Sequence, residues 1–129
     1  MNKIYLLSPW SETKYRVPQN SLNYIKFYLL DHGYHAEIID CMHYDRNLND
    51  IIDKLKGNKR PVVGITAYTR ERFHAYDLIK RIRKEIPDSL IVVGGRHFGT
   101  LAVETLGELP QVNIVVRGEG EITFKEICD

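Results

Sequence analysis

Short apolar runs alternate with helical patterns from one end of the chain to the other, and this constrains the fold most. The runs that indicate strands are Lys3–Ser8, His35–Asp40, Val62–Thr66, Leu90–Val93 and Asn113–Val116. Most are apolar throughout rather than at every second residue, which is typical of a sheet covered on both faces. Strands that alternate with helices through short connections indicate a parallel, doubly wound sheet.

Helical periodicity fills the segments between these runs. The first helix begins near Asn20 and is expected to end at Gly33, where a glycine suits the left-handed position after a helix. Further helices are expected from Asn47 as N-cap to Gly57, from Arg70 to Glu85, from Thr100 to Leu106 and from Glu121 to Cys128. The sequence therefore predicts an α/β fold, a flavodoxin-like (Rossmann-like) three-layer sandwich with a five-stranded parallel sheet, and residues 1–129 as a single domain.

Composition excludes several classes of protein. The formal net charge of +1 gives no strong field to attract nucleic acid or an anionic membrane. The apolar runs are far shorter than the roughly 20 residues of a membrane span. No signal peptide is expected, because the opening MNKIYLLSPW reaches Pro9 too early for the apolar region of one. Cys41 and Cys128 alone are too few for a disulfide framework or a self-contained iron–sulfur or zinc site, so a cytoplasmic location is expected.

Two successive strand endings run directly into glycines in the stretch Val92–Glu121. Gly94 and Gly95 end one strand, and Gly118 and Gly120 follow the next. Glycines past the carboxyl end of a strand let the backbone approach a ligand that a Cβ would block. Open α/β sheets bind their ligands at this edge, so the two loops predict a binding site.

The residues in the carboxyl-end loops suit a large, mostly neutral ligand with amide groups better than a lone phosphate. The candidate binding residues are Pro9, Thr66, Tyr68, Thr69, Gly94, Gly95, His97, Phe98, Gly118, Glu119 and Gly120. The alternatives are a simple tight turn at Gly94–Gly95, a backbone-bonded loop histidine at His97, and capping of the last helix by Glu119 or Glu121. A valine at Gly95 is expected to abolish binding and leave the fold intact.

The sequence lacks the motifs of several other classes of α/β protein. The first strand leads into SPWSET, which has no glycine for a dinucleotide fingerprint, and no Walker A loop is present. Ser8-Pro9 and Thr66-Ala67 replace the acidic residues of a phospho-acceptor domain. The G-x-S-x-G hydrolase elbow is absent, and no catalytic or metal-ligating residue is assigned.

The segments VVGGRH, RGEGE and ITFKEI together resemble the N-terminal cobalamin-binding domain of radical SAM enzymes. The upstream segments LLSP, IID and VVGIT agree, so the resemblance covers nearly the whole chain. GG-x-H followed by RGEGE is its specific part. The resemblance implies a corrin ring over the carboxyl ends of the strands and a nucleotide tail beside the sheet.

The resemblance also implies a longer parent chain. A radical SAM barrel would follow, with a Cys-x-x-x-Cys-x-x-Cys motif that holds a [4Fe–4S] cluster and acts on S-adenosylmethionine, in a methyltransferase or another radical enzyme. These 129 residues contain no such motif, so they are expected to be a fragment that is not catalytic alone. The implied partners are a corrinoid and the radical SAM domain.

One motif of many cobalamin proteins is missing. They carry Asp-x-His-x-x-Gly, whose histidine binds cobalt, whereas no histidine here follows an Asp by two residues, and His97 has Gly95 at that position. The resemblance thus implies base-off cobalamin without a protein histidine ligand. The alternative is a degenerate scaffold or interaction domain that no longer binds cobalamin. A flavin mononucleotide domain ranks lower, because SPWSET offers hydroxyls but no glycine.

Overall fold

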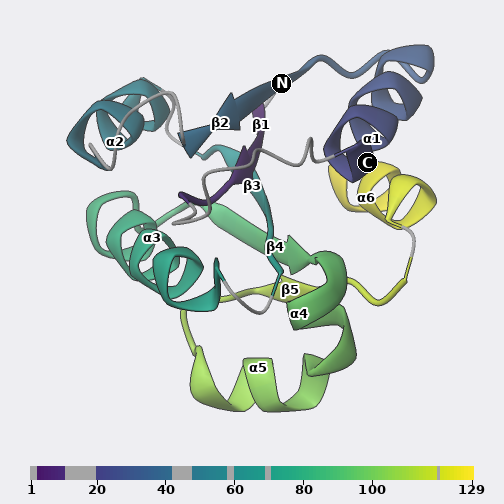
Figure 1. Ribbon diagram of the computed structural model, residues 1–129. Helices are drawn as coiled ribbons and strands as arrows, with labels where there is room; N and C mark the ends of the chain where they lie inside the picture. The colour runs from purple at the N-terminus through teal and green to yellow at the C-terminus, as the bar shows by residue number, and fades with distance from the viewer. Residues whose placement is uncertain (1–2, 11–19, 42–47, 58–59, 69–70, 119) are drawn as a thin grey trace.

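The computed structural model describes residues 3–10, 20–41, 48–57, 60–68, 71–118 and 120–129. It contains one parallel sheet with the strand order β2-β1-β3-β4-β5 (Figure 1). The strands are β1 (Ile4–Ser8), β2 (Ala36–Asp40), β3 (Val62–Thr66), β4 (Leu90–Gly94) and β5 (Ile114–Val115). This order is that of a flavodoxin-like sheet, so the predicted fold is confirmed.

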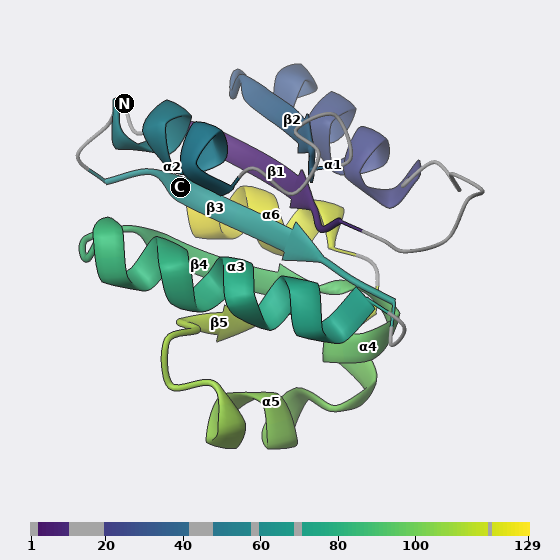
Figure 2. The same cartoon turned by 60° about the vertical axis from the view of Figure 1, so that its left-hand side comes forward.

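Helices cover both faces of the sheet (Figure 2). On one face, α1 (Asn20–Asp31) and α6 (Glu121–Cys128) lie against each other. On the other face lie α2 (Leu48–Lys56) and α3 (Arg72–Glu85). α4 (Gly95–Thr100) follows β4 directly, and α5 (Ala102–Glu108) packs beside β5. The predicted N-cap Asn47 lies outside the described residues.

Successive side chains along the three central strands point to opposite faces of the sheet, so the protein has two separate cores. The odd-numbered side chains, such as Leu7, Ile65 and Val93, pack towards α2 and α3. On the opposite face, Leu6 of β1 and Val92 of β4 pack towards α1 and α6. Each face of the sheet therefore has its own layer of side chains, and the two layers differ in how completely they are filled.

Two details of the chain path concern where helices end and begin. Gly33 ends α1 at a φ of 88°, and the Tyr34 N–H donates to the Leu29 carbonyl at 2.9 Å, as a glycine-terminated helix requires. The next helix was expected to begin only at Thr100, but residues from Gly95 onward already form α4. The His97 N–H donates to the Ala67 carbonyl at 3.1 Å, and this long-range contact holds the segment in a helical turn.

The following helix is also displaced from its predicted position. It was expected at Thr100–Leu106, and the structure places α5 at Ala102–Glu108.

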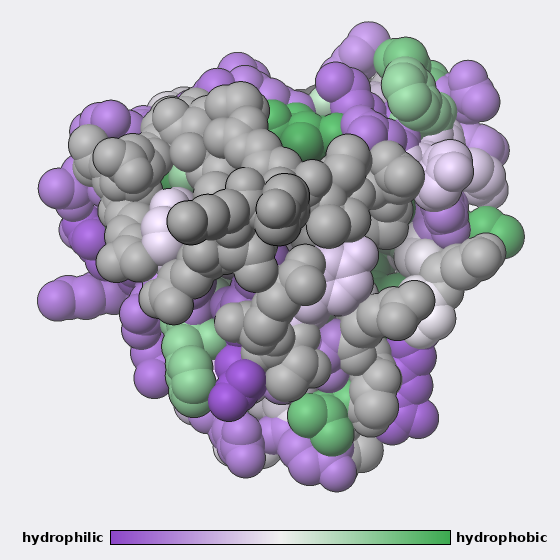
Figure 3. All heavy atoms as spheres, viewed as in Figure 1, coloured by the Kyte–Doolittle hydropathy of each residue, from purple (hydrophilic) through white to green (hydrophobic). Residues whose placement is uncertain are grey.

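The part of the surface drawn by hydropathy in Figure 3 is mostly hydrophilic, with small separate hydrophobic areas. Among the described residues, no helix has the length and apolar character needed to cross a membrane.

Candidate functional site

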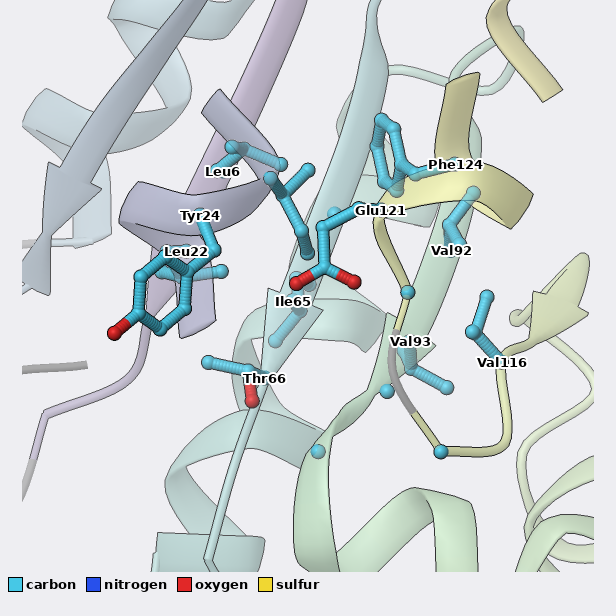
Figure 4. Close-up of a pocket in the computed structure, with 16 residues that line it drawn as sticks. Leu6, Leu22, Tyr24, Ile65, Thr66, Val92, Val93, Val116, Glu121 and Phe124 are labelled. Atoms are coloured by element: carbon cyan, nitrogen blue, oxygen red, sulfur yellow. The ribbon is translucent and has the colours of Figure 1, made fainter. Parts of the chain in front are cut away.

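A cavity of about 310 Å³ lies between the sheet and the α1–α6 layer (Figure 4). Its floor is a row of three residues in register across the sheet, Leu6 of β1, Gly64 of β3 and Val92 of β4. Leu22 of α1 and Phe124 of α6 form opposing walls. The surroundings are therefore mostly apolar, which suits a flat aromatic or other weakly polar group.

Gly64 lets the side chains of the α1–α6 layer approach this face of the sheet closely. A Cβ at this position would lie 2.8 Å from Cε2 of Phe124 and 3.0 Å from Cδ2 of Leu6. Glycine within a strand weakens it and often marks a site where another group approaches closely. Here the missing side chain lets the Phe124 ring lie against the strand. Gly64 was not among the predicted binding residues, although a glycine inside the apolar run VVGIT was the available signal.

Five of the predicted residues line the carboxyl end of this cavity. They are Thr66, Gly94, Gly95, Gly118 and Gly120. They come from the ends of three neighbouring strands, so the sheet topology brings both glycine loops to one site. The carboxylate of Glu121, in the first turn of α6, projects over the cavity in Figure 4. That position at the positive end of a helix also suits a carboxylate.

The other described candidates lie elsewhere. Pro9 is buried just after β1 and Tyr68 is half-buried after β3, and neither lines the cavity. His97 and Phe98 are buried on the side of α4 that faces α3, where the hydroxyl oxygen of Tyr76 lies 2.6 Å from Nε2 of His97. Thr69 and Glu119 lie outside the described residues.

Gly95 has a structural role that its sequence context did not reveal. Its φ of 87° falls in the left-handed region, where side chains are disfavoured. A Cβ there would collide with Oγ1 of Thr66 and lie 3.2 Å from the Ala67 nitrogen. The expectation that a valine at Gly95 leaves the fold intact is therefore wrong, because any side chain there would be strained by the positive φ and would collide with Thr66 at the end of β3.

The ionisation of His97 follows from its surroundings. Burial is the main cause that lowers its pKa, and the nearby Arg72 guanidinium lowers the pKa further, against an opposing effect of Glu108. The ring is therefore neutral at pH 7. Among the described residues, no group of three or more His, Cys, Asp or Glu side chains is arranged to hold a metal ion.

The sheet order and the apolar cavity beside two glycine loops define a flavodoxin-like ligand-binding domain. Residues 10–128 match the family model described as the B12 binding domain. The chain therefore belongs to the B12-binding domain family, which confirms the resemblance seen in the VVGGRH and RGEGE segments.

The chain matches curated relatives over only part of their length. The chain is 41% identical over 95 residues to the uncharacterized methyltransferase PH0819 of Pyrococcus horikoshii, a match that covers 73% of this chain and 20% of that protein. It is 32% identical over 99 residues to the anaerobic magnesium-protoporphyrin IX monomethyl ester cyclase of Rubrivivax gelatinosus, covering 76% and 18%. The chain thus spans about a fifth of the length of these relatives.

The fold also matches a solved enzyme. The radical S-adenosylmethionine methyltransferase TsrM from Kitasatospora setae, in a structure with cobalamin and a [4Fe-4S] cluster bound, superposes with a TM-score of 0.83. The identity is 20%, and the match covers 98% of this chain and 26% of TsrM. At this identity the comparison supports the shared fold.

Proposed function

We propose that the chain binds cobalamin, with the nucleotide tail in the cavity beside Gly64 and the corrin ring over the glycine loops. The observation that carries this proposal is the cavity itself, which runs from the interior residue Gly64 to Thr66, Gly94 and Gly118 at the carboxyl edge. Its volume of about 310 Å³ is at the low end of the roughly 300–1,000 Å³ of ligand pockets. It suits the tail, while the larger ring would lie outside.

The residues present fit this cofactor. The apolar walls match an aromatic nucleotide base, and the Thr66 hydroxyl is a polar group near the opening. The absence of Asp-x-His from the sequence supports a cobalt without a protein histidine ligand, and a nucleotide tail held in the cavity would keep its base off cobalt. When bound, the cobalt of such a cofactor can carry a methyl group for transfer. The protein supplies the cradle, the orientation and the exclusion of water.

The wider part of the proposal concerns the parent chain. The short coverage of the curated relatives and the fold shared with TsrM support a longer protein in which a radical SAM barrel follows. That barrel would hold a [4Fe–4S] cluster and S-adenosylmethionine, and the whole would act as a methyltransferase or another radical enzyme in the cytoplasm. A Cys-x-x-x-Cys-x-x-Cys motif encoded after Asp129 would support this, and a complete gene without one would contradict it.

The binding proposal is tested by titration of the purified protein with hydroxocobalamin and methylcobalamin. We expect a change in the visible spectrum and retention of one corrinoid per chain after gel filtration. Reduced to the cob(II)alamin form, the complex should lack the electron paramagnetic resonance splitting that an axial nitrogen produces. Such a splitting would contradict the base-off, histidine-free mode while leaving binding itself intact.

Gly64→Val tests where the tail binds. The added side chain would clash with Phe124 and Leu6, which both line the cavity, so we expect the cavity to change shape and corrinoid retention to be lost. Gly107→Ala is the control, because a Cβ at Gly107 meets nothing within 4 Å and alanine favours a helix. A folded wild-type protein that retains no corrinoid would favour the degenerate scaffold domain instead. Equal retention by Gly64→Val would place the tail elsewhere.

A further inference from the structure

His97 and Phe98 belong to the GG-x-H segment but do not line the cavity. Phe98 is completely buried and His97 is 4% exposed, both on the side of α4 that faces α3. The rings of His97 and Tyr76 have centroids 5.8 Å apart, and those of Tyr76 and Phe98 lie 6.1 Å apart. These residues form an aromatic cluster directly behind the cavity wall.

His97 connects this cluster to the end of β3. Its backbone N–H donates to the carbonyl of Ala67, 3.1 Å away, while its ring Nε2 lies 2.6 Å from the Tyr76 hydroxyl. Ala67 follows Thr66, and Gly95 is packed closely against both residues. The contacts of His97 on one side therefore fix the position of the Thr66–Gly95 wall on the other.

Both partners of the short contact are uncharged near neutral pH. Burial lowers the pKa of His97 and raises that of Tyr76, so the ring is neutral and the hydroxyl keeps its proton. Among the described residues, Arg72 of α3 lowers the pKa of His97 and Glu108 of α5 raises it. A neutral His97 ring can either accept from the Tyr76 hydroxyl or donate to it, whereas a protonated ring has only N–H donors and could only donate to it.

We infer that His97 and Tyr76 are positioning residues for the corrinoid site. Their hydrogen bond holds α4 against the end of β3 and keeps the Gly94–Gly95 wall in the conformation that admits the ligand. This inference rests on the proposed cobalamin binding. It assigns the histidine of the GG-x-H segment a role behind the site rather than in contact with cobalt.

The first test is Tyr76→Phe, which removes one hydroxyl and keeps the ring. We expect the affinity for methylcobalamin to fall about three- to tenfold, the effect of losing one hydrogen bond. Tyr28→Phe in α1 is the matched control and should bind as the wild type does. His97→Gln, which can still donate and accept, should retain more affinity than His97→Leu. Lower stability of Tyr76→Phe with unchanged affinity would show a merely structural role and overturn the inference.

A second measurement needs no corrinoid and so separates this inference from the proposed function. In the free protein, Tyr76→Phe should speed hydrogen exchange at the His97 amide, which donates to Ala67. Exchange at the Val116 amide, which donates to Val93 at 2.8 Å, should not change. Unchanged exchange at His97 would overturn the inference. Failure of the wild type to bind methylcobalamin, with the exchange effect present, would instead overturn cobalamin binding.

The pH dependence gives a third readout. If the bound state requires a neutral His97, affinity for methylcobalamin should fall as the pH drops from 7.5 through the lowered pKa of His97. His97→Gln should flatten this profile. His35→Gln, at an exposed histidine before β2, should leave it unchanged. A wild-type profile that His97→Gln does not alter would contradict the required neutral ring.

Discussion

The two faces of the sheet use the same three central strands and reach different results. Towards α2 and α3, Leu7, Ile65 and Val93 are each at most 2% exposed within a large continuous core. One residue earlier along each strand, Leu6, Gly64 and Val92 face α1 and α6 and leave a cavity. A single glycine in the middle strand is the main difference between these two rows.

Because of this difference, we expect the α2–α3 face to contribute mainly to stability and the α1–α6 face mainly to ligand binding. Close packing on the α2–α3 face maximises contacts between side chains, whereas the walls of a cavity lack contact partners on one side. A ligand that fills the cavity restores those contacts and stabilises the folded state by mass action. Substitutions on the two faces should therefore have different consequences.

The largest expected effect is on stability. Ile79 of α3 is completely buried in the packed face, so Ile79→Ala should lower the free energy of unfolding by about 2–5 kcal/mol. Leu22→Ala in the cavity wall should cost less, because Leu22 already borders empty space. Urea unfolding measures both.

Corrinoid affinity should show the reverse order. Leu22→Ala should bind corrinoid more weakly than the wild type does, whereas the folded molecules of Ile79→Ala should bind it with unchanged affinity. The contrast between the faces fails if Leu22→Ala costs as much stability as Ile79→Ala and binds corrinoid normally.

An intermediate effect is expected from the two adjacent glycines of the first loop. Gly95→Ala should cost at least about 1–2 kcal/mol from left-handed strain alone, before its collision with Thr66 is counted. Gly94 has an extended backbone, and its Cβ would lie no nearer than 3.6 Å to Val116. Gly94→Ala should therefore change stability by less than about 0.5 kcal/mol. Similar unfolding midpoints for the two variants would contradict the assigned role of Gly95.

The elements could be predicted because their signals are local. Continuous apolar runs, a terminal glycine such as Gly33 and a stop at Pro87 mark the ends of strands and helices within a few residues. α4 was missed because its cause is not local. Its first turn begins at a glycine pair, and it is held by the contact between His97 and Ala67, which lie thirty positions apart in the chain.

The edge of the site was predictable and its interior was not. Strand-end glycines and Thr66 were identified because parallel strands present their carboxyl ends at one edge. Leu22 and Phe124 line the cavity, yet in the sequence they look like any core residue on a helix face. His97 was placed among the binding residues because the chain order does not show that it turns towards Tyr76 on the far side of α4.

The smallest expected difference is chemical and needs no substitution. Each core contains one cysteine: Cys41 is 1% exposed in the packed core, and Cys128 is half-buried against the cavity-side core. Burial is the main cause that raises the pKa of Cys41 to about 12 and that of Cys128 to about 11. One unit of pKa corresponds to about a tenfold smaller thiolate fraction, and thiolate is the reactive form.

Iodoacetamide should therefore alkylate Cys128 first, and Cys41 mainly through opening of the fold. Both rates should keep rising with pH beyond the ordinary thiol pKa of 9.0. Because the folded pKa values are raised, the stabilising effect of keeping both thiols protonated should be lost as the pH rises from 9.0 through about 11 and 12. Mass spectrometry of peptides after timed labelling measures the two rates. Equal rates would mean that the packed face opens as readily as the face with the cavity, and a plateau near pH 9 would contradict the raised thiol pKa values.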